Sequence, residues 1–130
     1  MYGQEWSFGH TDAGTGVFAC EPMQNRAHIF RETIDLGEVE VSPVEVEAII
    51  ARLKPLWMGP DYHMVHRNCC SFCEAFAKEL RCPLGIPAWL NSLAETGAPA
   101  LRFSYLRTRI CTLTVLSSAR AGSSILGWFS

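Results

Sequence analysis

The chain has 130 residues, of which 48% are hydrophobic and 18% charged, a composition typical of one globular domain. Its formal net charge of −2 disfavours nucleic acid as the main partner, because neutralising phosphates needs clustered Lys and Arg. No apolar run approaches the roughly 18 residues of a membrane span, and no basic and apolar leader opens the sequence. We therefore expect a protein of the cytoplasm, with the nucleus as a second compartment, that contacts neither nucleic acid nor membrane.

Three short strands are predicted in the first part of the chain. Residues 2–8, 17–20 and 28–36 carry apolar side chains in the alternating phase of strands. The turn-rich stretch 9–16 favours a hairpin between the first two, and Gly37 ends the third.

Two helices with clear start signals follow. Ser42 is a capping residue, and Glu45 completes a capping box at the start of a helix over 43–54. Asn68 is a good N-cap for a second helix over 69–82, in which apolar residues recur every four positions.

The remaining segments carry weaker signals. Residues 62–66 are short and strand-like, and 86–95 begin a third, shorter helix. After residue 103 the chain is rich in Ser and Thr and shows no turn or capping pattern. We therefore expect a domain over 1–103 followed by an irregular Ser/Thr-rich tail over 104–130. The fold class is α+β, with a small antiparallel sheet packed against helices.

The six cysteines are not spaced as a disulfide framework, because three of them lie within five residues. Cys69 directly follows the predicted cap Asn68. There, the N–H groups and partial positive charge of a helix start favour thiolate over thiol. Cys69 is therefore a candidate nucleophile, and the alternative is a small apolar residue at a helix start. Cys73 and Cys82 are expected to be buried structural thiols.

Two other kinds of site overlap Cys69. Cys70 and Cys73 form a C-x-x-C pair at a helix start, as in dithiol redox proteins, although no βαβ pattern surrounds them. His63 and His66 could join Cys69 and Cys73 in a zinc quartet. However, two residues three apart on a strand point to opposite faces, which argues against a shared metal. We therefore predict no metal and no cofactor.

A thiol peptidase also needs a base, and the sequence alone does not place one. His66 lies three residues before Cys69, but the pattern does not bring its ring to the sulfur. His10 lies in the turn-rich loop, and His28 and His63 occupy ordinary strand positions.

Four segments resemble, in chain order, the blocks of the PPPDE family, whose members are DeSI-type desumoylating isopeptidases. The second DeSI branch is the most similar. The segments are YGQEWSFG at 2–9, FRETIDLG at 30–37, YHMVHRNC at 62–69 and IPAWLNSLA at 86–94. The resemblance covers about residues 2–97, and the Asn-Cys step is its most diagnostic part.

This resemblance implies a permuted papain-like fold and a cysteine isopeptidase that removes SUMO or ubiquitin from conjugated proteins. Cys69 is then the nucleophile, whose thiolate attacks the isopeptide carbonyl and releases the lysine amine. A thioester remains for water to hydrolyse. Backbone N–H groups at the helix start are the expected oxyanion donors, and Asn68 is expected to help position the site.

Two departures from the family pattern bear on activity. Cys70 and Ser71 stand where the family usually carries Asn and His after the nucleophile. The family's catalytic histidine lies in a strand that would fall before Met1. The domain is therefore expected to lack its first strand or strands and its general base, and to have an open sheet edge.

Three interpretations of the missing histidine remain open. The chain is a fragment of an active enzyme, an inactive short form that still binds a ubiquitin-like protein, or an enzyme in which another histidine serves. A non-catalytic ubiquitin- or SUMO-binding module is the main alternative function. A thiol-redox protein that uses Cys70 and Cys73 is the distant one.

Overall fold

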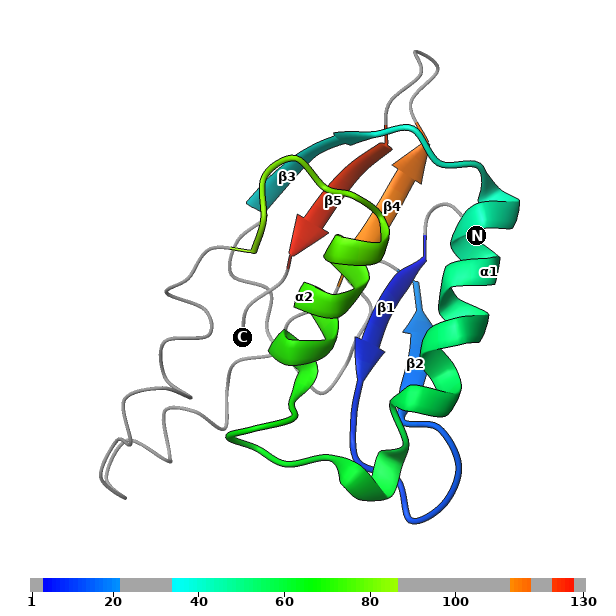
Figure 1. Cartoon of the computed structure of the whole chain (residues 1–130), viewed down its shortest axis with the longest axis vertical. Helices are drawn as coiled ribbons and strands as arrows, with labels where there is room; N and C mark the ends of the chain where they lie inside the picture. The colour runs from blue at the N-terminus through cyan, green and yellow to red at the C-terminus, as the bar shows by residue number, and fades with distance from the viewer. Residues whose placement is uncertain (1–3, 22–33, 87–112, 118–122, 128–130) are drawn as a thin grey trace.

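The computed structural model describes residues 4–21, 34–86, 113–117 and 123–127. A five-stranded sheet has the spatial order β2-β1-β4-β5-β3, and α1 and α2 lie on one face of it (Figure 1). Each strand pairing is antiparallel. The elements are β1 (Glu5–Phe8), β2 (Val17–Cys20), β3 (Ile34–Val39), α1 (Pro43–Leu53), η1 (Lys54–Leu56), η2 (Gly59–Asp61), α2 (Cys69–Glu79), β4 (Leu113–Ser117) and β5 (Ser123–Gly127). The predicted α+β class is confirmed.

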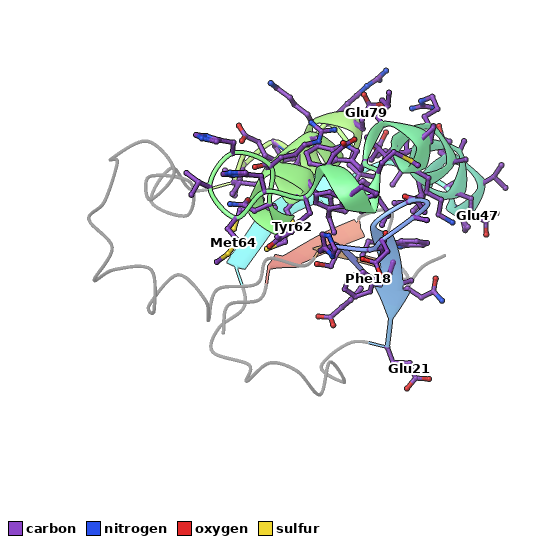
Figure 2. All side chains as sticks on the ribbon, turned by 90° about the horizontal axis from the view of Figure 1, so that it is seen from below. Phe18, Glu21, Glu47, Tyr62, Met64 and Glu79 are labelled. Carbon is purple, nitrogen blue, oxygen red and sulfur yellow. The ribbon has the colours of Figure 1, made fainter. Side chains whose placement is uncertain are left out.

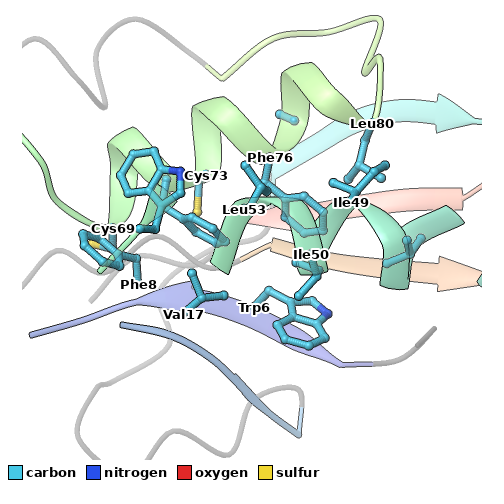
Figure 3. Close-up of a cluster of buried hydrophobic side chains, with 14 of the residues drawn as sticks. Trp6, Phe8, Val17, Ile49, Ile50, Leu53, Cys69, Cys73, Phe76 and Leu80 are labelled. Atoms are coloured by element: carbon cyan, nitrogen blue, oxygen red, sulfur yellow. The ribbon is translucent and has the colours of Figure 1, made fainter. Parts of the chain in front are cut away.

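The core lies between the helices and β1 (Figure 3). Phe8 of β1 belongs to this core, with its ring centroid 5.0 Å from that of Trp57 and 6.3 Å from that of Phe72. Trp57 and Phe72 meet edge to face at 5.5 Å, an arrangement that aromatic rings favour. The core therefore joins β1 to both the end of the α1 region and the start of α2.

The start of α1 follows from its sequence. The Glu45 amide donates to Ser42 Oγ at 3.3 Å, and the Ser42 amide donates to Glu45 Oε2 at 2.6 Å. This is the predicted capping box. The apolar stripe of the helix is buried, and α1 ends at Leu53, one residue before the predicted end. The residues of the stripe are Val46, Ile49, Ile50 and Leu53.

The end of the chain corrects the expectation of an irregular tail over 104–130. Its residues 113–117 and 123–127 form β4 and β5, which pair along their whole length and lie between β1 and β3. β1 consequently has a strand on each side, β2 and β4.

The segment 62–66, predicted as a strand, is also corrected. It forms a turn closed by an isolated bridge between His63 and Arg67. Other predictions, the third helix over 86–95 and the first part of the strand over 28–36, lie outside the described residues. Within the described ranges, no helix has the length and apolar character needed to cross a membrane.

Candidate active site

Asn68 caps α2 and places Cys69 as the first residue of the helix. The Asn68 side-chain oxygen accepts from the Ser71 amide at 3.0 Å and from Ser71 Oγ at 3.1 Å. In return, the Asn68 amide donates to Ser71 Oγ at 3.4 Å. The predicted N-cap is confirmed, and Ser71 has a role that the sequence did not reveal. It departs from the family pattern yet completes a capping box.

Cys69 faces the core and has only 3% of its surface exposed. Figure 3 shows Cys69 and Cys73 on the side of α2 that faces β1. Cys73 is fully buried, as expected, and Cys82 is half-buried. Burial raises the pKa of the Cys82 thiol to about 11. Cys69, Cys70, Cys73 and Cys82 are all thiols rather than disulfides.

A tight turn leads into the cap. His63 and Arg67 exchange two backbone hydrogen bonds of 2.9 and 3.0 Å. His63 Nδ1 accepts from the amides of Val65 and His66, each at 3.2 Å. The turn is joined to the helix start because Asn68 Nδ2 donates to the Met64 carbonyl at 3.0 Å.

Arg67 ties this turn to the core. Its guanidinium lies 4.1 Å above the Trp57 ring and donates to the Leu56 carbonyl. Trp57 also contacts Phe8 and Phe72, so Arg67 connects the turn that precedes Cys69 to the buried aromatic core.

The geometry corrects the argument that we used against a zinc quartet. His63 and His66 do not point to opposite faces, since their rings stack with centroids 4.7 Å apart. Even so, the part of the chain that the structure describes holds no group of three or more His, Cys, Asp or Glu suited to a metal ion.

The histidines considered as bases are not equivalent. His63 Nδ1 is engaged in the turn, so it cannot take a proton from a thiol without giving up those two bonds. His66 stacks on it, and both rings are exposed. His10 is exposed in the loop between β1 and β2, and His28 lies outside the described residues.

Tyr62, in the segment that leads into the turn, packs against the core in a way that the sequence analysis missed. Its ring is half-buried and lies 5.3 Å from Phe8. Burial, followed by the charges of Cys69 and Cys70, raises the pKa of its hydroxyl to about 12. The sequence offered no local signal for the burial of Tyr62, because its contact with Phe8 depends on how the turn folds back toward β1.

Comparisons with known proteins identify the family of the chain. The family described as "PPPDE putative peptidase domain" matches residues 1–108, and the chain belongs to this family. The resemblance noted in the sequence is thereby confirmed. No solved structure matches the chain significantly.

Three curated relatives are similar over about three-quarters of the chain. A Caenorhabditis elegans protein named desumoylating isopeptidase 1 homolog is 33% identical over 100 residues, which are 73% of this chain. DeSI-like proteins of Arabidopsis thaliana and Schizosaccharomyces pombe are 30% and 35% identical, over 72% and 75% of it. The aligned regions span only 30%, 42% and 49% of the three relatives.

Proposed function

We propose that this chain is a cysteine isopeptidase that removes SUMO or ubiquitin from conjugated proteins, with Cys69 as its nucleophile. The observation that carries the proposal is the position of Cys69 at the first residue of α2, directly after the Asn68 cap. Membership of a peptidase family and the names of the relatives support the same reaction.

In this proposal the Cys69 thiolate attacks the isopeptide carbonyl carbon, and the tetrahedral intermediate collapses to release the lysine amine, whose nitrogen takes a proton from water. Water then hydrolyses the thioester and restores the thiol. Backbone N–H groups at the start of α2 stabilise the oxyanion. Asn68 acts as a positioning residue, because its side chain is engaged with Ser71 and Met64. His63 is not assigned as the base, since its Nδ1 holds the turn.

One observation favours the non-catalytic alternative, a module that binds ubiquitin or SUMO without cleaving it. Cys69 is 3% exposed, so a substrate carbonyl reaches the sulfur only if the site opens. The thiol-redox alternative receives less support, because the family that the chain belongs to is described as a peptidase family.

The test is labelling of the purified chain with SUMO and ubiquitin probes that carry a C-terminal electrophile. We expect a covalent adduct with the wild type and with Cys82→Ser, the matched control at another thiol, but none with Cys69→Ser. Binding of unmodified SUMO or ubiquitin without an adduct would replace the enzyme by the binding module. An adduct that persists in Cys69→Ser would overturn the assignment of the nucleophile.

A further inference from the structure

A cavity of about 520 Å³ lies at the end of α2 that is farther from Cys69. Three segments line it, namely the end of β3 with the two residues after it, one face of α1, and the last residue of α2 with the two that follow. Because α2 is about 16 Å long, the cavity is separate from the candidate active site at the start of this helix. Its volume falls within the range of roughly 300–1,000 Å³ that small-molecule sites occupy.

The buried part of the lining is apolar. Val39 of β3, Ile49 of α1 and Leu80, which follows α2, line the cavity and are all buried. Their side chains present an aliphatic surface to whatever enters. A ligand that places an aliphatic group on this surface removes apolar area from water, which favours binding.

The exposed part of the lining carries charges of both signs. Arg52 of α1 and Glu79 of α2 form an ion pair with a distance of 2.9 Å, and both side chains are exposed (Figure 2). Glu45 is engaged as well, because its Oε2 accepts from the Ser42 amide at 2.6 Å in the capping box of α1. These three charged groups therefore already have partners within the protein.

Two charged residues of the lining remain, Arg81 and Glu40. In the ranges that the structure describes, neither side chain forms a hydrogen bond or an ion pair. The charge of Arg81 acts toward α1, since it contributes, after the hydrogen bonds from Ser42, to a pKa of Glu45 below its usual value. A simple anion in the cavity would be repelled by the carboxylates, and a simple cation by the guanidinium groups. A zwitterion complements both free charges.

The backbone conformation also singles out Arg81. Its φ of 57° lies in the left-handed region, which no other non-glycine residue of the described ranges adopts. It belongs to a Schellman motif, in which the Arg81 amide donates to the Lys78 carbonyl and the Cys82 amide to the Ala77 carbonyl, both at 3.0 Å. Glycine is the usual residue at this position, because a side chain there costs stability. The chain carries an arginine instead, and its side chain lines the cavity.

We propose that this cavity binds a small zwitterion with an aliphatic side chain, which is an apolar α-amino acid, either free or in a short peptide. The Arg81 guanidinium holds the carboxylate, Glu40 accepts from the ammonium group, and the aliphatic side chain covers the buried apolar lining. Binding makes and breaks no covalent bond. It involves neither Cys69 nor a conjugated protein, so it stands apart from the isopeptidase proposal.

The test is a titration of the isotope-labelled full chain with leucine, followed by two-dimensional amide NMR spectra. We expect saturable shifts of the signals of residues 39–41 and 79–81. Leucinamide lacks the carboxylate, the hydroxy analogue of leucine lacks the ammonium group, and serine lacks the aliphatic side chain. Each should bind about tenfold more weakly or less, because a charged hydrogen-bond partner or the apolar contact is lost. Equal affinities for leucine and leucinamide would overturn the proposal.

The dipeptide Ala-Leu distinguishes the two sources of this chemistry, because its ammonium group lies one residue farther from the carboxylate. Tighter binding of Ala-Leu than of leucine identifies a short peptide as the ligand, and the reverse order identifies the free amino acid. If neither compound shifts the signals in a saturable manner, the proposal is wrong.

Arg81→Gly is the most informative variant, because glycine adopts a positive φ without strain and therefore keeps the end of α2 intact. We expect Arg81→Gly and Glu40→Gln each to weaken binding by about tenfold. Lys78→Ala is the matched control, since it removes an exposed positive charge from α2 outside the cavity lining and should bind like the wild type. The same spectra show whether each variant is folded. An unchanged affinity in Arg81→Gly or in Glu40→Gln would contradict the proposed site.

Discussion

Asn68 connects the turn that precedes Cys69 to the helix that carries it, through hydrogen bonds to Met64 and Ser71. Asn68→Ala removes both, and loss of an N-cap typically costs about 1 kcal/mol. Asn68→Asp is the matched variant, because a carboxylate still accepts from Ser71 but cannot donate to Met64. We expect the midpoint of urea unfolding to fall clearly for Asn68→Ala and less for Asn68→Asp. Equal midpoints for Asn68→Ala and the wild type would show that the cap contributes no stability.

Cys82 makes stability depend on pH in the alkaline range. Burial raises its pKa from 9.0 to about 11, so the folded state keeps the neutral thiol while the unfolded state ionises first. The unfolded state therefore gains stability as pH rises from 9 to 11, and the folded protein becomes less stable. Cys82→Ala removes this contribution. In urea unfolding at pH 8 and pH 10, we expect the wild type to lose more stability than Cys82→Ala. Equal losses of stability in the two proteins would show that the Cys82 thiol does not cause the pH dependence.

At the scale of elements, hydrogen bonds from backbone amides to the His63 side chain stabilise the His63–Arg67 turn. His63 Nδ1 accepts two backbone N–H groups, a role that the side-chain oxygen of asparagine also fills in Asx-turns. His63→Ala should lower the free energy of unfolding by about 1 kcal/mol, because two donors lose their acceptor. His63→Asn should retain most of the stability. Thermal unfolding measures the melting temperatures of the two variants. Equal melting temperatures for His63→Ala and His63→Asn would show that the His63 side chain does not stabilise the turn.

The helix starts could be predicted from sequence because capping is local. Ser42 and Asn68 each lie three residues before the partner that completes their box, so the signal falls within one turn of chain. The 62–66 turn could not be predicted, because its apolar alternation is typical of a strand. Its fold depends on which atoms of His63 and Asn68 meet backbone groups. The packing of the Tyr62 ring against Phe8 follows from that turn and was missed with it.

At the scale of the whole molecule, the sheet order depends on contacts between distant parts of the chain. β4 pairs with β1 through Thr114 and Glu5, which are more than 100 positions apart in the sequence. Composition indicated an irregular tail, since a Ser/Thr-rich segment with short apolar blocks has little local preference for strand. Pairing with β1 and β3 overrides this weak preference, because the contribution of a residue to the stability of a strand depends on its neighbours in the sheet.

Thr114 provides the sharpest test of this arrangement, because it pairs with Glu5 of β1 and with Leu126 of β5. Proline has no backbone N–H and is tolerated in sheets only at edges or bulges. We expect Thr114→Pro to lower the free energy of unfolding by on the order of 3 kcal/mol. Thr114→Val, which keeps the N–H group and a β-branched shape, should unfold much like the wild type.

The readout is urea unfolding followed by both tryptophan fluorescence and far-ultraviolet circular dichroism. If β4 completes the sheet, the loss in Thr114→Pro appears in both signals, because β1 carries Trp6 into the core beside α1 and α2. If Thr114→Pro instead unfolds at the same urea concentration as Thr114→Val, β4 and β5 add nothing to the stability of the fold. The interpretation of the tail that was based on composition would then be correct, and β1 would pair with β2 alone.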